Sequence, residues 1–407
     1  MNHVRTPIYM DHHATTPVDE RVLEAMLPFF AERFGNAASR SHVFGWEAEE
    51  AVERARKQVA QVIGATPQEI VFTSGATESD NLAIKGLLAH RKIERPHLIV
   101  SAIEHRAVLD PARRMAESGC DVTIVPVGES GIVDPDDIAR AITDHTVLIS
   151  IMTANNEIGT IQPIREIGRI AHERDVLFHT DAAQAVGHIP LNVDDDHIDL
   201  LSISAHKVYG PKGIGALYVR RKRPRIRLDA IIDGGGHERG FRSGTLPVPL
   251  IVGLGTAVDI ASKSMSDESA RLSGLRDDLL KQILDEIPDA FVNGTLSPRL
   301  PHNLNVSFAG VDSESVLTEM RDVALSSGSA CSSAVPEASH VLAALGYDAA
   351  RIKAAIRFGL GRSNTHDEIA YVVDRLADTV RRLRQASPRR RMDEQNPPSE
   401  TVTTMEQ

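Results

Sequence analysis

The sequence is poor in cysteine and has no long apolar run, and each shortage excludes a class of protein. Its 407 residues include two cysteines, Cys120 and Cys331, and no Cys-x-x-Cys pair. A disulfide framework and a structural zinc site are therefore not expected, and the expected location is the reducing cytoplasm. No run predicts a membrane span, and the first residues lack the apolar stretch of a signal peptide, so no membrane partner is expected.

The sequence also lacks an excess of positive charge. Its formal net charge is −11, which argues against direct nucleic-acid binding. The basic run at 220–227 is the exception, and we interpret it as a solvated loop because it follows a short strand-like segment. The proportions of hydrophobic and charged residues are those of an ordinary globular protein, and the length suits two domains.

The pattern of apolar residues predicts an α/β fold. Short apolar runs typical of buried strands alternate with amphipathic helical stretches. This alternation predicts a largely parallel sheet covered on both faces, with ligand chemistry at the carboxyl ends of its strands. The predicted strands lie at 70–73, 97–101, 122–125, 147–152, 176–180, 198–204 and 214–219, and the helices among them lie at 80–90, 108–118, 135–142 and 164–173.

Helical segments and a second domain flank this region. Helical spacing of apolar residues is found over 19–34 and 46–63. After the predicted sheet, 250–287 is expected to be helical in two or three pieces. A smaller α+β domain follows, with an amphipathic last helix at 367–385. Residues 387–407 have little apolar content and are predicted to be disordered.

The stretch 202–215, S-I-S-A-H-K-V-Y-G-P-K-G-I-G, places Lys207 just after a predicted strand, with Ser204 and His206 beside it. Apolar and glycine neighbours strip water from a lysine and make its neutral amine more accessible. A neutral amine can form a Schiff base with an aldehyde. Taken alone, a surface lysine in a glycine-rich loop would be the simpler interpretation.

The segment 73–81, T-S-G-A-T-E-S-D-N, joins a predicted strand to a helix. Gly75 allows a tight turn, and Ala76 and Thr77 fall near the helix start. Free N–H groups there, the helix dipole and the Thr77 hydroxyl suit a phosphate. The alternative is an ordinary capped helix start.

Three more polar side chains are predicted at or just beyond strand ends. Asp181 could keep a ring nitrogen protonated and Gln184 could bind a ring hydroxyl, although a lone Asp more often caps a turn. His105 could stack on a planar ring and carry protons near neutral pH, and its alternative is a loop histidine. His12 and His13 are adjacent, which is not helix-face metal spacing, so no metal is assigned.

Two residues further along the chain have competing interpretations. Cys331 lies in S-S-G-S-A-C-S-S-A, where a thiol in a polar loop is reachable, but it could also be a small loop residue. Cys120, before a predicted strand, fits a packed position better. Arg357 lies in an otherwise apolar strand, where a guanidinium usually has a carboxylate partner. The partner of Arg357 could therefore be the carboxylate of a bound molecule or that of a structural ion pair.

With these motifs in hand, the chain resembles the cysteine desulfurases of the class V aminotransferase group, especially the IscS/NifS type, from about Tyr9 to Pro388. Seven segments carry the resemblance: D-H-H-A-T-T-P-V-D at 11–19, G-N-A-A-S-R-S-H at 35–42, T-S-G-A-T-E-S-D-N-L-A-I-K-G at 73–86, N-N-E-I-G at 155–159, H-K-V-Y-G-P-K-G at 206–213, G-G-G-H-E-R-G-F-R-S-G-T at 234–245 and S-S-G-S-A-C at 326–331.

The resemblance implies a fold-type I enzyme that depends on pyridoxal 5′-phosphate (PLP). Such a homodimer converts L-cysteine to L-alanine and delivers the sulfur as an enzyme persulfide. The implied domains are a large PLP-binding α/β domain at 15–260, with a mainly parallel sheet, and a smaller α+β domain. The smaller domain comprises 1–14 and 261–386 and carries the Cys331 loop.

The resemblance also implies roles for single residues. Lys207 would carry PLP as a Schiff base, and Cys331 would attack the substrate sulfur. His105 would stack on the ring, Asp181 would pair with the ring nitrogen, and Gln184 would meet the ring hydroxyl. The phosphate would be held by Ala76, Thr77, Ser204 and His206, with Thr245 of the partner subunit, and the substrate carboxylate would be held by Asn156 and Arg357.

The chain departs from the family pattern at three places. Ala205 replaces the usual glycine of S-G-H-K, and a methyl group is expected to fit if φ is negative. Ser332 follows Cys331, where threonine is common. The segment after Pro388 is rich in Arg, Pro and Glu, whereas close relatives use this region to dock an iron–sulfur scaffold.

Alternative functions remain at this point. A selenocysteine lyase or an aminotransferase would share the fold, and a docking component of a sulfur relay would need no catalysis. Lys207, Asp181 and His105 together favour catalysis, and the loop around Cys331 favours a desulfurase. The sulfur acceptor is open between an iron–sulfur scaffold, whose cluster Cys331 would transiently ligate, transfer-RNA thiolation and DNA phosphorothioation.

Overall fold

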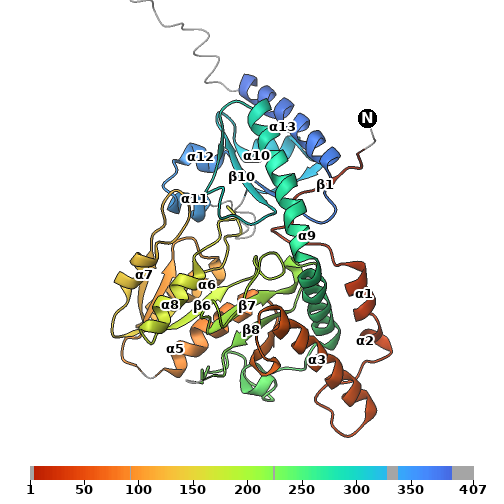
Figure 1. Ribbon diagram of the computed structural model, residues 1–407, viewed down its shortest axis with the longest axis vertical. Coiled ribbons are helices and arrows are strands. Elements are labelled where there is room, and N and C mark those ends of the chain that lie inside the picture. The colour runs from red at the N-terminus through yellow and green to blue at the C-terminus, as the bar shows by residue number, and fades with distance from the viewer. Residues whose placement is uncertain (1–3, 92, 223–224, 328–337, 387–407) are drawn as a thin grey trace, which may run out of the picture.

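The computed structural model describes residues 4–91, 93–222, 225–327 and 338–386. Cys331 and the segment 387–407, which carry two of the sequence predictions, lie outside these ranges. Figure 1 shows a larger body built on one sheet and a smaller body above it, with helix α9, Val248–Glu286, running from one to the other.

The larger body contains a seven-stranded sheet in the order β2-β8-β7-β6-β5-β3-β4. Strand β8 pairs antiparallel with both of its neighbours, and all other pairs are parallel. The predicted α/β fold with a mainly parallel sheet is therefore confirmed. The strands are β2 Ile70–Thr73, β3 His97–Ser101, β4 Asp121–Val125, β5 Thr146–Ser150, β6 Leu177–Asp181, β7 Leu200–Ser204 and β8 Gly215–Val219.

Helices cover both faces of this sheet. Successive side chains of each strand point to opposite faces, and both sets are apolar. On β2, Ile70 and Phe72 belong to one core and Val71 to another. The first core is completed by α1, α3, α8 and α9, and the second by α5 and α6. The helices are α3 Val43–Val62, α4 Ala76–Asn81, α5 Leu87–His90, α6 Arg106–Glu117, α7 Pro135–Ala141 and α8 Ile164–Glu173.

Two predictions of where a helix is interrupted were wrong. The expected helix at 19–34 is two helices, α1 Glu20–Met26 and α2 Pro28–Ala31, because Pro28 starts a new helix and has no N–H to continue the first. The region 250–287, expected in pieces, is the single 39-residue helix α9. Gly253 and Gly255 pack closely on neighbouring elements, and this tertiary contact outweighs their low helix propensity.

Helix α9 joins the two bodies through its buried residues. Up to Ala261 they pack into the core of the large sheet, and from Leu272 onward they pack into the core of the smaller body. By length and composition α9 could cross a membrane, contrary to the expectation that no segment could. Its position between two packed cores is that of a core helix in a globular protein.

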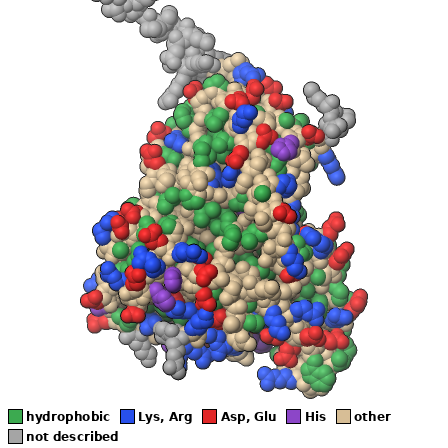
Figure 2. All heavy atoms as spheres, viewed as in Figure 1, with side chains coloured by type: hydrophobic (Ala, Val, Ile, Leu, Met, Phe, Trp, Pro, Cys, Tyr) green, Lys and Arg blue, Asp and Glu red, His purple; other side chains and the backbone are tan. Residues whose placement is uncertain are grey.

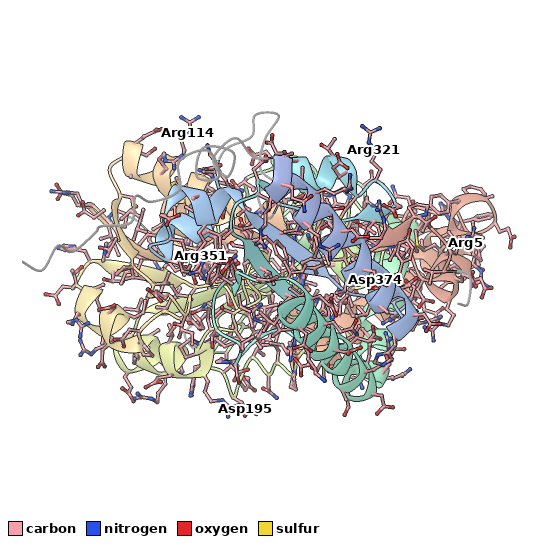
Figure 3. All side chains as sticks on the ribbon, turned by 90° about the horizontal axis from the view of Figure 1, so that it is seen from above. Arg5, Arg114, Asp195, Arg321, Arg351 and Asp374 are labelled. Carbon is pink, nitrogen blue, oxygen red and sulfur yellow. The ribbon has the colours of Figure 1, made fainter. Side chains whose placement is uncertain are left out.

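The smaller body is an α+β unit, as the sequence predicts. Its antiparallel sheet has the order β12-β10-β9, and β1 pairs separately with β11. Figure 3 shows Arg351 turned into this body while Arg321 projects outward. The elements are β1 Ile8–Tyr9, β9 Ala290–Val292, β10 Asn303–Phe308, α10 Ser313–Glu319, β11 Val323–Ala324, α11 His340–Ala344, α12 Ala349–Lys353, β12 Ala355–Gly359 and α13 His366–Ala386.

The basic run at 220–227 is only partly the solvated loop that the sequence predicts. Arg220 is buried and forms an ion pair with Asp199, which is also buried. Ile226 and, just after the run, Leu228 are buried in the core beneath the second face of the sheet. The buried ion pair of Arg220 and the buried side chains of Ile226 and Leu228 therefore pack this part of the chain against the sheet after β8.

Candidate active site

The predicted site residues converge on one cavity at the carboxyl end of the large sheet. The cavity has a volume of about 470 Å³. Asp181 is the last residue of β6, and Lys207 ends a single 3₁₀ turn that directly follows β7. Nine predicted residues line it: Ala76, Thr77, His105, Asn156, Asp181, Gln184, Ser204, His206 and Lys207.

Lys207 is held by main-chain carbonyls of the N-terminal arm. Its Nζ donates to the carbonyl oxygen of Ala14 at 2.9 Å and to that of His13. The preceding Ala205 is fully buried and does not have a positive φ, so its methyl group fits as expected. The two carbonyl oxygens therefore fix the position of the amine, and Lys207 lines the cavity.

The strand-to-helix turn at Ser74–Thr77 forms one end of the cavity. Gly75 has a φ of +153°, and the start of β8 packs against it so closely that a Cβ on Gly215 would lie 2.6 Å from the Cα of Gly75. Helix α4 begins at Ala76, and the helical chain continues through a π-helical turn, Leu82–Gly86, into α5. The first N–H groups of a helix point outward and suit an anion.

Basic side chains surround this end of the cavity. Lys207 and Lys212 line it, and Arg242 lies beside it, paired with Glu78 at 3.0 Å. Burial, followed by the charges of both lysines, lowers the pKa of His206 to about 4, so its ring is neutral. The His206 Nδ1 lies 3.1 Å from the hydroxyl of Thr15.

Asp181 places a buried carboxylate at the cavity. One of its oxygens accepts a hydrogen bond from the N–H of Ala183 at 2.9 Å. Burial raises the pKa of Asp181, while His105 and Lys207 oppose that rise. A carboxylate in this position gains by pairing with a cationic N–H in the cavity.

His105 is the N-cap of α6, and its Nδ1 accepts a hydrogen bond from the N–H of Ala107 at 3.1 Å. The proton of the neutral ring is therefore on Nε2. Burial lowers the pKa of His105, and the nearby Asp181 opposes this effect. His105 can thus exchange a proton or donate a hydrogen bond only through Nε2 while it caps the helix.

Arg357 lies beside the cavity and not in its lining. It is fully buried on β12, and its Nη2 donates to Asp11 Oδ1 at 2.8 Å, an ion pair that the sequence left open. Its Nη1 donates to the carbonyl oxygen of Asn156 at 3.0 Å. The Nε atom is buried without a partner among the described residues.

Two more predicted positions lie elsewhere. Thr245 is exposed and does not line the cavity of its own chain. It follows a loop anchored by the buried pair between Arg56 and Glu238, whose atoms lie 2.8 Å apart. Cys120 is buried, and burial raises the pKa of its thiol to about 11, which agrees with the packed position expected for it.

Sequence reasoning missed the contribution of the N-terminal arm. Asp11, His13 and Thr15 contact Arg357, Gln184 and His206 respectively. The motif D-H-H-A-T-T supports the family resemblance, but main-chain acceptors such as the carbonyl of His13 leave no trace in residue type.

The residues of the cavity fit PLP. The helix start at Ala76 and the side chain of Lys212 suit a phosphate, and Asp181 offers a buried carboxylate for a protonated ring nitrogen. Lys207 offers an amine for the aldehyde. The cavity volume is also within the range of small-molecule sites.

This fold and this cavity define a fold-type I, PLP-dependent transferase. The chain belongs to the class-V aminotransferase family, because the family model described as aminotransferase class-V matches residues 8–372.

Within that family, the chain is similar to cysteine desulfurases. It is 54% identical over 385 residues to cysteine desulfurase IscS of Anaeromyxobacter dehalogenans, which covers 95% of both chains. It is 53% identical over 385 residues to the cysteine desulfurase of Homo sapiens, which covers 95% of this chain and 84% of the human one. A solved structure described as a NifS-like protein matches with a TM-score of 0.86 and 36% identity over 92% of this chain and 99% of that one. The activity is that of a PLP-dependent cysteine desulfurase.

Proposed function

We propose that the cavity around Lys207 is the desulfurase centre, that Cys331 receives the sulfur, and that the sulfur is delivered to iron–sulfur cluster assembly. The observation that carries the proposal is the convergence of Lys207, Asp181, His105 and the helix start at Ala76 on one cavity. PLP supplies an electron sink there, which allows the substrate Cα proton to leave and the Cβ–S bond to weaken.

The chain's own residues perform the remaining steps in this proposal. Lys207 moves protons at Nζ, since the carbonyls of His13 and Ala14 hold the amine in one orientation. His105 holds a proton at Nε2, and the buried carboxylate of Asp181 would pair with a cationic ring nitrogen of PLP. Gln184, whose position is fixed by His13, would bind the ring hydroxyl.

The substrate carboxylate is assigned to Asn156 and Arg357. Asn156 lines the cavity, and Arg357 donates to its main chain. Because Arg357 already pairs with Asp11, its donation to a substrate requires the guanidinium to be shared between two carboxylates.

The change Arg357→Lys is expected to raise the KM for L-cysteine about 10- to 100-fold, because an ammonium cannot donate two parallel bonds to a carboxylate; a charged hydrogen bond contributes about 1.5–3 kcal/mol. Steady-state kinetics with a parallel thermal melt would measure it. The matched control is Arg351→Lys, at a half-buried arginine of the smaller body that donates to Asn293. An unchanged KM with a lowered melting temperature would show that Arg357 has only a structural role.

We also propose a homodimer. Large apolar side chains are exposed on one side of the larger body, where Phe34 and Phe44 stack at 5.4 Å. Figure 2 shows hydrophobic side chains gathered over α2 and the start of α3, at the lower right. Such a patch marks a protein interface, and a dimer would let Thr245 reach a neighbouring cavity. The exposed residues are Leu23, Leu27, Phe30, Phe34, Val43, Phe44 and Trp46.

The change Phe44→Asp is expected to shift the protein from dimer to monomer, because it introduces a charge into this patch. Sedimentation velocity would measure the shift, and PLP content should fall with it. Ile124→Asp is a suitable control, since Ile124 is an equally exposed apolar side chain on edge strand β4. A variant at Phe44 that stays dimeric would argue against this interface.

The acceptor and the location complete the proposal. The relatives named IscS support iron–sulfur assembly, and the free thiol of Cys120 is compatible with a reducing cytoplasm. The test combines the purified protein with PLP, L-cysteine, ferrous iron and an iron–sulfur scaffold protein. Alanine production with cluster formation on the scaffold is expected. Alanine production without sulfur transfer to the scaffold would overturn the proposed acceptor.

A further inference from the structure

Three buried imidazole rings stack on one another directly behind Lys207. The rings of His13 and His302 are 4.3 Å apart at 22°, and those of His302 and His188 are 4.2 Å apart at 28°. We call these residues the histidine stack. His13 comes from the N-terminal arm, His188 from the segment after β6, and His302 from the residue before β10, so the stack bridges the larger and smaller bodies.

The outer rings of the stack hold the site through defined atoms. His13 Nδ1 donates to Gln184 Oε1 at 2.9 Å, and the main-chain carbonyl of His13 accepts from Lys207 Nζ. At the other end, His188 Nε2 donates to the carbonyl oxygen of Lys207 at 3.0 Å. Since carbonyl oxygens only accept, these contacts fix the tautomers of both outer rings. The middle ring, His302, stacks on both outer rings.

The surroundings of the stack oppose a positive charge. His13 Nε2 and His302 Nδ1 are buried without hydrogen-bond partners among the described residues, so an added proton would have no acceptor there. Two protonated rings in stacking contact would also repel each other. Burial lowers the pKa of all three. Neighbouring positive charges lower the pKa of His13 and His302 further, whereas the hydrogen bond to the Lys207 carbonyl and the charge of Glu268 oppose the fall for His188. The charged and titratable groups facing the stack are Lys207, Arg276, Arg357, Arg362, the carboxylate Glu268, and His12 with its neighbour Asp11.

We propose that the three residues of the histidine stack are positioning residues, which hold Lys207 and Gln184 in place only while their rings are neutral. Protonation of the stack in acid then weakens the binding of PLP. This inference rests on the proposed roles of Lys207 and Gln184. No group of three or more metal-binding side chains occurs among the described residues, and stacked rings do not direct their nitrogens at one ion.

The sign of the pH effect follows from the lowered pKa values of the stack. A histidine that is neutral when folded and ordinary when released contributes fully above about pH 6.5. Its contribution falls as the pH drops below that value. The equilibrium between the held and the released site then shifts toward release by up to tenfold per pH unit for each ring. PLP retention should therefore fall steeply between about pH 6.5 and pH 5.

The change His302→Phe tests this inference on the PLP-loaded enzyme, because phenylalanine keeps an aromatic middle ring that cannot be protonated. The readouts are the visible absorbance of lysine-linked PLP and the PLP released through a filter, each followed against pH. We expect the curve of PLP loss against pH to be less steep for His302→Phe, because its release takes up one proton fewer, which is a difference of about tenfold per pH unit. The midpoint of the curve should lie at lower pH. His302→Ala, which removes the ring, should release PLP faster at neutral pH.

The control is His145→Phe, because His145 is exposed and far from the stack in sequence, and its profile should match wild type. If His302→Phe does not fold, His302→Gln serves as the second non-ionisable variant. Identical acid profiles for wild type and the His302 variants would overturn the stack's role. Absence of lysine-linked absorbance in wild type at neutral pH would instead overturn the proposed site itself, so the two failures are distinguishable.

Discussion

Replacing Lys207 with alanine is expected to abolish the visible absorbance of lysine-linked PLP and to lower alanine production by at least about 10³-fold. The variant loses both the amine for the PLP aldehyde and the group that moves protons at the substrate Cα. We expect the variant to remain folded, although it loses the hydrogen bonds from Lys207 Nζ to two carbonyls of the arm. Absorbance spectra, borohydride trapping and alanine assays would measure the effect.

The matched control is Lys212→Ala. Lys212 also lines the cavity, but it is exposed in the glycine-rich loop and is not at a strand end. We expect this variant to keep the lysine-linked absorbance, with at most weaker PLP binding from the loss of one positive charge. A borohydride-reducible link that survives in Lys207→Ala, or that disappears in Lys212→Ala, would move the role to Lys212.

The general plan of the site could be predicted from the sequence because its chemistry lies where local signals are strong. Asp181 ends a strand, Lys207 follows one by a single turn, and Gly75 marks the strand-to-helix turn. In a parallel α/β sheet these positions share one edge, so their convergence follows from the alternation of strands and helices. The assignment to PLP chemistry, however, came from the family resemblance and not from this geometry.

Contacts between distant segments could not be predicted in the same way. The pair between Asp11 and Arg357 joins residues 346 positions apart, and the stack of His13, His188 and His302 draws on three separate segments. No periodicity or spacing within a segment reports such a contact. For this reason the sequence alone leaves Arg357 open between a bound carboxylate and a structural ion pair, and it indicates of His13 only that its spacing does not suit a metal site.

The break in the first predicted helix and the continuity of α9 have a related cause. Pro28 was visible in the sequence, but apolar spacing on both sides of it favoured one helix. The region of α9 is expected in two or three pieces from the sequence, yet a Cβ at Gly255 would lie 2.6 Å from the Cα of Ala55. Gly255 allows α9 to pack closely on α3, a tertiary contact that helix propensity alone does not predict.

Replacing Cys331 with alanine is expected to eliminate the protein persulfide and nearly all sulfide release from L-cysteine. PLP binding should persist, because Lys207, Asp181 and the helix start at Ala76 are unchanged. The expectation rests on thiol chemistry, since a thiolate is the nucleophile that can accept the substrate sulfur. Mass spectrometry after brief incubation with L-cysteine, without reductant, would detect the added sulfur.

Cys120→Ala is the matched control for Cys331→Ala, because it removes the other thiol of the chain. The Cys120 thiol is buried, it donates to the carbonyl oxygen of Pro96 at 2.9 Å, and its pKa of about 11 keeps it protonated at neutral pH. Cys120→Ala should therefore form persulfide and alanine as wild type does. Added sulfur on Cys120, or full alanine production by Cys331→Ala, would contradict the role of Cys331 and favour a lyase that releases its product without a protein thiol.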